Sequence, residues 1–218
     1  MNLKILFEDA TLQVVDKPAG IDIEGIQHML PQGFLPAHRL DKDTSGVLLI
    51  AKTKESLEYF KAQFKERKVQ KTYLCLVEGS LKKEQGEIET LLGRSPNDRR
   101  KQKVFLPGEP RAEEKREAST KYRVLKQYQK YTFLEVMPKT GRKHQIRVHL
   151  SSLGHPLARD KLYGFKDQQI PEGLKRQFLH AQSLQLTIPS GEEKEFVSEL
   201  PEDLQKVLDT LETPWPQS

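Results

Sequence analysis

The feature that most constrains the fold is a junction between a charged segment and a short apolar run. Residues 38–46 are rich in charged and turn-forming residues, and they lead directly into the apolar residues 47–51. A continuous apolar run of this length, bounded by turn residues, is typical of a buried strand. We therefore expect a sheet whose buried strand begins at a polar turn, with Asp41 in that turn between Arg39 and Lys42.

The rest of the chain mixes strands and helices without a repeat. Leu57, Phe60 and Phe64 recur at helical spacing behind the capping residue Thr53, which predicts a helix over 54–67. Further helices are expected at 144–153, with Ile146, Leu150 and Leu153 on one face and Gly154 at the C′ position, and from Pro201 onward, with Leu204, Val207, Leu208 and Leu211 on its inner face. Strands are expected within 3–16 and over 69–77, 122–137 (a hairpin) and 178–188, and irregular chain over 21–37. Residues 80–118 are the most polar part of the chain, and 94–117 within them is expected to be a charged loop. This mixture, without strict βαβ alternation, favours a mixed α/β (α+β) fold with a largely antiparallel sheet.

Composition bounds the class of protein. At 218 residues the chain can bury a sizeable core, as one domain or two closely joined lobes. Its one cysteine, Cys75, excludes an intramolecular disulfide, and no apolar run approaches the roughly 20 residues of a membrane helix. Residues 1–10 have only a short apolar patch before Glu8 and Asp9, so we do not expect them to be a signal peptide. We therefore expect a cytoplasmic protein that does not contact a membrane.

The distribution of charge is more informative than its sum. The 36 Lys and Arg against 31 Asp and Glu give a net charge of +5, which permits a polyanionic partner but does not demand one. Within 94–103 lie five cations, Arg99, Arg100 and Lys101 among them, against the single anion Asp98. Such a segment is about as often a solvated loop as a phosphate-binding one.

Three residues are candidates for chemistry. Asp41 is the leading nucleophile, because a carboxylate can attack an anomeric or unsaturated carbon, provided that a nearby cation keeps it ionised. Arg147, expected near the positive end of a helix dipole, is the best partner for it. Tyr73, on the strand 69–77, is the third. The plainer alternatives are a turn-capping aspartate, an exposed arginine and a core aromatic residue.

Two other kinds of site are less well supported. Asp41 and Asp43 could form the carboxylate pair of a hydrolase, but a spacing of two residues fits that role poorly. His144 and His149 are five residues apart, which places them on different faces of a helix or a strand. Since HExxH, Walker A and Rossmann motifs are also missing from the sequence, we expect no metal and no cofactor.

Several segments resemble motifs of the RluA-like pseudouridine synthases. Residues 38–52, HRLDKDTSGVLLIAK, resemble the signature HRLDxxTSGxLLxAK, and residues 140–150 and 153–157 resemble TGRxHQIRxHL and LGHPL. Shorter matches are KPAG at 17–20, KxY at 71–73 and RQxLHA at 176–181. One departure is Arg159, which stands where the family's GDxxYG motif has glycine, and this puts the local backbone geometry in doubt.

The resemblance implies an RNA pseudouridine synthase that isomerises specific uridines in tRNA or rRNA. It implies the pseudouridine synthase fold, with a central sheet flanked by helices and a catalytic cleft. In the catalytic site, the resemblance implies that Asp41 is the nucleophile on a flipped-out uridine and that Arg147 is its partner. Tyr73 would stack on the uracil, and it is proposed as the base for the C2′ proton; Leu179 would line the uracil pocket, and His180 would be a structural residue. On the RNA, Arg39 would take the place of the extruded nucleotide, and Arg99, Arg100 and Lys101 of a charged loop, 94–117, would contact the RNA.

The resemblance also sets expectations for the organisation of the protein. We expect residues 1–218 to form a single catalytic domain without an N-terminal S4 domain. It would act on RNA as a monomer, without a cofactor and without an obligate protein partner. The alternative is a non-catalytic RNA-binding or RNA-chaperone protein with the same fold.

Overall fold

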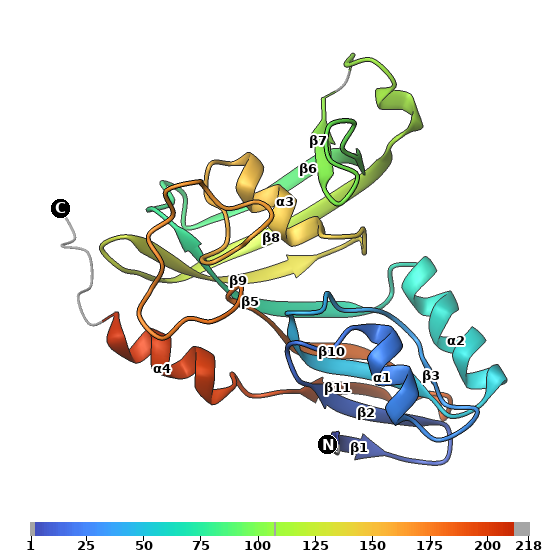
Figure 1. Ribbon diagram of the computed structural model, residues 1–218. Coiled ribbons are helices and arrows are strands. Elements are labelled where there is room, and N and C mark those ends of the chain that lie inside the picture. Colours follow the sequence, from blue (N-terminus) through green and yellow to red (C-terminus); the bar gives the residue numbers. More distant parts are fainter. Residues whose placement is uncertain (1–2, 107, 212–218) are drawn as a thin grey trace. The chain divides into compact units, whose positions relative to one another are not determined.

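The computed structural model describes residues 3–106 and 108–211 and divides into two compact units (Figure 1). The first unit comprises Met1–Tyr73 and Leu179–Pro201, and the second comprises Leu74–Phe178 and Glu202–Ser218. Both contain helices together with mainly antiparallel strands. The expected mixed α+β fold is therefore confirmed.

The first unit is built on a sheet of neighbouring strands that are distant in sequence. Its elements are β1 (Lys4–Glu8), β2 (Leu12–Lys17), α1 (Ile23–Met29), β3 (Leu35–Pro36), β4 (Ser45–Ala51), α2 (Lys54–Lys65), β10 (Leu179–Thr187) and β11 (Glu193–Val197). The strand order is β1-β2-β4-β10, with β3 paired to β4 and β11 paired to β10. Strands β4 and β10 run parallel, and the other described pairs of this unit are antiparallel.

Strand β4 is the buried strand that the apolar run predicts. All of its residues are buried. Val47 and Leu49 face a core that contains Phe60 of α2, whereas Leu48 faces a second core that contains Ile26 of α1. Because each face of β4 packs against a different helix, the strand is apolar at successive positions rather than alternating.

The two helices of this unit differ in how well the sequence predicts them. Helix α2 confirms the predicted helix, and Thr53 forms a capping box with Ser56, whose backbone N–H donates to the Thr53 hydroxyl at 3.1 Å. The expected irregular chain over 21–37 is wrong, because α1 lies within it. This helix has only seven residues and buries only Ile26, so it lacks a long periodic pattern. The Asp22 side chain caps it by accepting from a backbone N–H at 2.8 Å.

Strand β5 (Gln70–Glu78) continues from the first unit into the second. The further elements of the second unit are β6 (Gln85–Arg94), β7 (Gln102–Phe105), the 3-10 turn η1 (Ala112–Glu114), β8 (Arg116–Gln127), β9 (Tyr131–Pro138), α3 (Gln145–Ser152) and α4 (Glu202–Thr210). The strand order here is β5-β9-β8-β6-β7. The antiparallel pair of β8 and β9 confirms the predicted hairpin, although β8 begins earlier than expected.

Strands β6 and β7 lie in the polar segment 80–118, and β7 lies within the expected loop 94–117, so that part of the expectation is wrong. Strand β6 pairs along most of its length with β8 and at its end with β7. Ile88 and Leu92 are buried, whereas Glu87 and Glu89 on the opposite face are exposed. The strand is therefore polar in composition, and its pairing with β8 rather than its hydrophobicity defines it.

Helix α3 contacts β7, β8 and β9 (Figure 1). Ile146 and Leu150 are buried as expected, but Leu153 is 44% exposed, because it is the C-cap residue at the end of the helix. Gly154 has φ +85°, as the predicted C′ position requires.

Helix α4 confirms the helix predicted after Pro201. Leu204 and Val207 are buried, and Leu208 and Leu211 are half-buried. The described part of the chain contains no helix whose length and apolarity would let it cross a membrane. Residues 212–218, and residue 107 within the predicted loop 94–117, lie outside the described residues.

Candidate active site

Asp41 lies in a turn between β3 and β4, and its side chain is half-buried. The backbone N–H of Thr44 donates to the Asp41 carbonyl at 3.0 Å. The backbone N–H of Gly20 donates to the Lys42 carbonyl at 2.9 Å. The turn is therefore closed within itself and is also held by the segment 17–20.

Lys17 adds a second restraint to this turn. Its side chain is fully buried, and its ammonium donates to the carbonyls of Pro18 and Ile21 at 2.8 Å and of Lys42 at 3.1 Å. A buried ammonium without acceptors would be costly, so these bonds fix the backbone directly after Asp41. In the sequence, residues 17–20 stood out only as a match to the motif KPAG. The sequence signal for this role was Lys17 itself, at the start of the segment.

The end of the turn is fixed by the parallel pairing of β4 with β10. Ser45 lies opposite His180, and its hydroxyl is 2.9 Å from Nδ1 of that residue. The other ring nitrogen, Nε2, is 3.0 Å from the Ser198 carbonyl, so it carries the proton and Nδ1 accepts from the serine. At Gly46, φ is +114° and a Cβ atom would overlap the Ala181 backbone. These contacts are consistent with the expected structural role of His180.

Tyr73 lies in the same unit as Asp41 and close to it. Burial raises the pKa of the Tyr73 phenol, and the negative charge of Asp41 raises it further. The ring packs against the core cluster that contains Leu40 and Ala181. Its hydroxyl is therefore neutral at physiological pH, and its ring and the Asp41 carboxylate belong to one local environment.

The two remaining candidates of the first unit differ in exposure. Arg39, which precedes Asp41 by two residues, is exposed. Leu179 is the first residue of β10 and is 4% exposed. No group of three or more His, Cys, Asp or Glu residues that could hold a metal ion occurs among the residues that the structure describes.

Arg147 lies in the second unit, on α3, and forms a bidentate ion pair with Asp160. Its Nε is 2.7 Å from Oδ2 of Asp160, and its Nη2 is 2.8 Å from Oδ1. The Arg147 side chain is 10% exposed and that of Asp160 is fully buried. The expectation of an exposed surface arginine is therefore excluded. The expected pairing of Arg147 with Asp41 stays a prediction.

Asp160 is the residue that the sequence motifs did not single out. Burial raises the pKa of its carboxyl, but the hydrogen bonds and charge of Arg147 and the backbone N–H groups of Leu162 and Tyr163 outweigh burial and lower the pKa overall. Asp160 is thus ionised and fixes the plane of the Arg147 guanidinium. The available signal was its place in the segment that resembles GDxxYG.

The departure from that motif at Arg159 has a visible consequence. Arg159 has φ +57°, in the left-handed region that glycine adopts readily and other residues adopt at a cost. Its Nε atom is buried, and no hydrogen-bond partner for it occurs among the described residues. The backbone thus keeps a glycine-like conformation although the side chain is an arginine.

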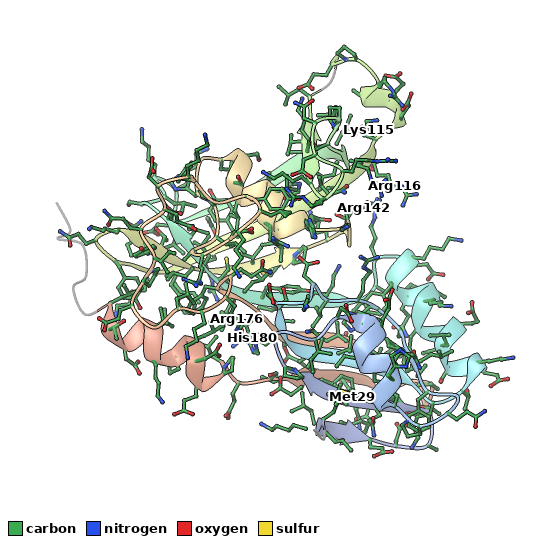
Figure 2. All side chains as sticks on the ribbon, in the orientation of Figure 1. Met29, Lys115, Arg116, Arg142, Arg176 and His180 are labelled. Atoms are coloured by element: carbon green, nitrogen blue, oxygen red, sulfur yellow. The ribbon has the colours of Figure 1, made fainter. Side chains whose placement is uncertain are left out.

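The cations of the segment 94–103 lie on the hairpin formed by β6 and β7. Arg99 and Arg100 are exposed, and Arg100 forms a bidentate pair with Asp98 whose shorter distance is 2.8 Å. The Lys101 ammonium lies 6.0 Å from the centroid of the Tyr163 ring. Close to the same hairpin, Figure 2 shows a further group of cations, namely Lys115, Arg116 and Arg142. This end of the second unit is therefore cationic and largely exposed.

Comparison with other protein sequences identifies the family. The pattern of the RNA pseudouridylate synthase family matches residues 11–152. Ribosomal large subunit pseudouridine synthase D of Nitrosomonas europaea is 39% identical over 96% of this chain and 65% of its own length. An uncharacterized RNA pseudouridine synthase of Aquifex aeolicus is 39% identical over 79% of this chain and 59% of its own length. The chain thus spans less than two thirds of the length of these relatives.

Comparison with solved structures agrees. Human RNA pseudouridylate synthase domain containing 1 is 28% identical, with a TM-score of 0.81 over 99% of this chain and 97% of that one. Human RNA pseudouridylate synthase domain containing 4 is 26% identical, with a TM-score of 0.79. By the matched family pattern and by these relatives, the chain belongs to the RNA pseudouridylate synthase family.

Proposed function

We propose that this chain converts uridine to pseudouridine within RNA and that Asp41 is the nucleophile. The observation that carries the proposal is the turn that holds Asp41. Lys17 fixes its backbone, β4 anchors its end, and Tyr73 lies close enough for the Asp41 charge to raise its pKa. A carboxylate that is fixed beside an aromatic ring is well placed to attack a flipped-out uridine whose base stacks on that ring. Membership of the family supports this class of reaction.

The proposed reaction is an isomerisation that conserves atoms and electrons. The N1–C1′ bond breaks and its electron pair leaves with the uracil, while the Asp41 carboxylate bonds to C1′. The uracil then turns, and C5 bonds to C1′ as the carboxylate departs. The proton on C5 is lost and N1 gains one, so that no oxidant or reductant is consumed.

Tyr73 serves in this proposal as a stacking platform for the uracil. A phenol must lose its proton before it can act as a base, and both burial and the Asp41 charge oppose that loss by raising the pKa. The uncharged ring has no such requirement, and an aromatic face suits a flipped base. The buried Leu179 would form an apolar part of the same pocket.

Arg147 and Arg39 have distinct proposed roles. We propose that Arg147 pairs with the Asp41 carboxylate and stabilises its negative charge. Its guanidinium is already oriented by Asp160, so little reorganisation accompanies the reaction. The exposed Arg39 would enter the RNA in place of the extruded uridine. It would offset part of the free energy needed to unstack the uridine, which is on the order of a few kcal/mol.

The proposed substrate is ribosomal RNA of the large subunit, with tRNA as the alternative. The Nitrosomonas relative and a 34% identical protein of Vibrio vulnificus are named ribosomal large subunit pseudouridine synthases. The exposed Arg99 and Arg100 and the neighbouring Lys101 would hold the phosphate backbone. The Arg100 pair with Asp98 is exposed and therefore weak enough for a phosphate to replace it.

The test compares Asp41→Asn with Asp43→Asn from the same turn. Each protein is incubated with ribosomal RNA and with tRNA transcripts, and pseudouridine is mapped along the products. We expect wild type and Asp43→Asn to form pseudouridine in ribosomal RNA, and Asp41→Asn to form none while its RNA affinity stays within several-fold. Full activity of Asp41→Asn would exclude Asp41 as the nucleophile.

The same assay separates the alternative functions. A hydrolase that uses Asp41 and Asp43 together would release free uracil and would lose activity in both variants. A non-catalytic RNA-binding protein would leave the RNA bound and unchanged. Modification of tRNA without modification of ribosomal RNA would keep the reaction and overturn the proposed substrate.

A separate measurement tests the proposed binding of RNA by the hairpin. Replacing Arg99, Arg100 and Lys101 with glutamine should weaken RNA binding and flatten the dependence of log K on log salt, by about 0.7–0.9 for each phosphate that the variant no longer neutralises. The matched control replaces Lys54, Lys61 and Lys65, which lie on the exposed face of α2. An unchanged salt slope in the hairpin variant would show that these cations are only solvated.

A further inference from the structure

Tyr163 connects the cationic hairpin to the start of the helix that carries Arg147. The hydroxyl of Tyr163 accepts a hydrogen bond from the backbone N–H of Gln102 at 2.7 Å. The same oxygen lies 2.9 Å from Nδ1 of His144. Gln102 is the first residue of β7 and follows Lys101 directly, and His144 immediately precedes α3. One phenol oxygen therefore joins two functional segments of the second unit.

The Tyr163 ring extends this connection to the charged groups on either side. The Arg147 guanidinium lies 5.2 Å from the ring centroid, and the Lys101 ammonium lies 6.0 Å from it. Both distances fall within the range of cation–π attraction. The ring thus contacts one cation proposed to hold RNA and one proposed to support the nucleophile.

The backbone of Tyr163 is itself held firmly. Its N–H donates to the Asp160 carboxylate at 3.0 Å, and its carbonyl accepts from the Ser151 hydroxyl at 3.0 Å. Tyr163 is therefore anchored both to α3 and to the Arg147–Asp160 pair. Because the backbone of Tyr163 is held in this way, its side chain can fix the position of the groups that it contacts.

The conformation of His144 indicates that this connection has a structural cost. His144 has φ +55°, and helix α3 begins without a side-chain N-cap hydrogen bond. A residue other than glycine in the left-handed region is strained, and such strain persists where surrounding contacts require it. The hydrogen bond between Tyr163 and His144 is one of those contacts.

We propose that Tyr163 is a positioning residue, which sets the cationic β6–β7 hairpin at a defined place relative to Arg147. This inference rests on the proposed function, because it assigns the hairpin to the RNA backbone. With the hydroxyl bonded to Gln102 and His144, phosphates held by Arg99 and Lys101 stand at a fixed distance from α3. Without the hydroxyl, the hairpin still carries its cations, but the phosphates that they bind no longer stand at a fixed distance from α3.

The test is Tyr163→Phe, which removes the oxygen and keeps the ring beside Arg147. The matched control is Tyr131→Phe in the same unit, because the Tyr131 hydroxyl donates to the Gln169 carbonyl at 2.6 Å and lies outside the hairpin. We expect Tyr163→Phe to raise KM for the RNA roughly tenfold, with kcat within about twofold of wild type. Tyr131→Phe should leave both within about twofold.

A double-mutant cycle with Arg99→Ala separates positioning from simple destabilisation. If Tyr163 positions the hairpin, the loss of RNA affinity caused by Arg99→Ala becomes much smaller in the Tyr163→Phe background. Additive effects, or a Tyr163→Phe variant that behaves like Tyr131→Phe, would overturn the inference. If Tyr163→Phe does not fold by circular dichroism, His144→Gly replaces it, since glycine adopts the left-handed conformation readily and has no side-chain atom that could bond the Tyr163 hydroxyl.

The outcomes also distinguish this inference from the proposed function. The cycle is measured by RNA binding as well as by turnover. A wild-type protein that binds RNA without forming pseudouridine would refute the proposed function, and the binding cycle would still decide the role of Tyr163. Pseudouridine formation with an additive cycle would uphold the function and refute the positioning role.

Discussion

Removing the Asp160 carboxylate should destabilise the second unit more than any loss of an exposed ion pair. The Asp160 side chain is fully buried, and that of Arg147 is 10% exposed, so Asp160→Ala leaves a guanidinium buried without this counter-charge. Loss of one partner of a buried pair costs about 3–5 kcal/mol. The backbone N–H groups of Leu162 and Tyr163 also lose an acceptor, at about 1 kcal/mol or more each. We therefore expect the free energy of unfolding to fall by at least about 5 kcal/mol.

The matched control is Asp203→Ala, which breaks a second bidentate pair in the same unit. Arg176, labelled in Figure 2, donates to Asp203 at 2.8 and 3.1 Å, but the Asp203 side chain is 53% exposed. The Arg176 side chain is 10% exposed, like that of Arg147, so the two pairs differ mainly in the exposure of the carboxylate. A pair with an exposed carboxylate should contribute about 1 kcal/mol. Urea unfolding at pH 7, followed by circular dichroism, gives both values by linear extrapolation. Equal decreases in the two variants would show that burial of the carboxylate does not determine the cost.

Three further predictions concern the backbone and buried groups. Burial, with a smaller contribution from a nearby lysine, lowers the pKa of His38 to about 3 in the folded protein. Because the unfolded chain binds a proton at His38 already near pH 6.5, the stability of the fold should decrease as the pH drops from about 6.5 toward 3. His38→Gln should flatten that part of the pH profile of the urea midpoint. Gly46→Ala should lower the free energy of unfolding by about 3 kcal/mol or more, because the added Cβ would overlap the Ala181 backbone. Gly20→Ala, at φ +89° with open space around it, should lower it by only about 1–2 kcal/mol. Equal decreases for the two variants in urea unfolding would contradict this. Arg159→Gly should raise the unfolding free energy by about 1 kcal/mol by removing left-handed strain, and a lower melting temperature would show that the arginine side chain stabilises the fold.

The sequence predicted those parts of the fold that depend on neighbouring residues. Thr53 and the helical spacing behind it defined α2, and the run 47–51 defined the buried strand β4. The hairpin of β8 and β9 and the helix α3 followed from the same kind of local pattern. The short helix α1 escaped prediction, because a helix with one buried residue has no periodicity to detect.

The candidate site was predictable only as a set of separate residues. The motifs identified Asp41, Tyr73 and Arg147 as candidates, and the match of residues 11–152 confirmed the family. The motifs did not indicate that Asp160 holds the Arg147 guanidinium or that Lys17 fixes the Asp41 turn. These contacts depend on side chains that meet through packing, which spacing in the sequence does not encode.

By itself, then, the sequence determined the family, the order of the main elements and the chemical type of each candidate residue. Only the tertiary structure decided which groups are buried, which carry hydrogen bonds, and that polar segments form β6 and β7. The physical reason is that capping and periodicity are properties of adjacent residues, whereas burial is a property of the whole packed unit. Tyr163 shows the difference: a single tyrosine in the sequence becomes, once folded, the hydrogen-bonded link between Gln102 and His144.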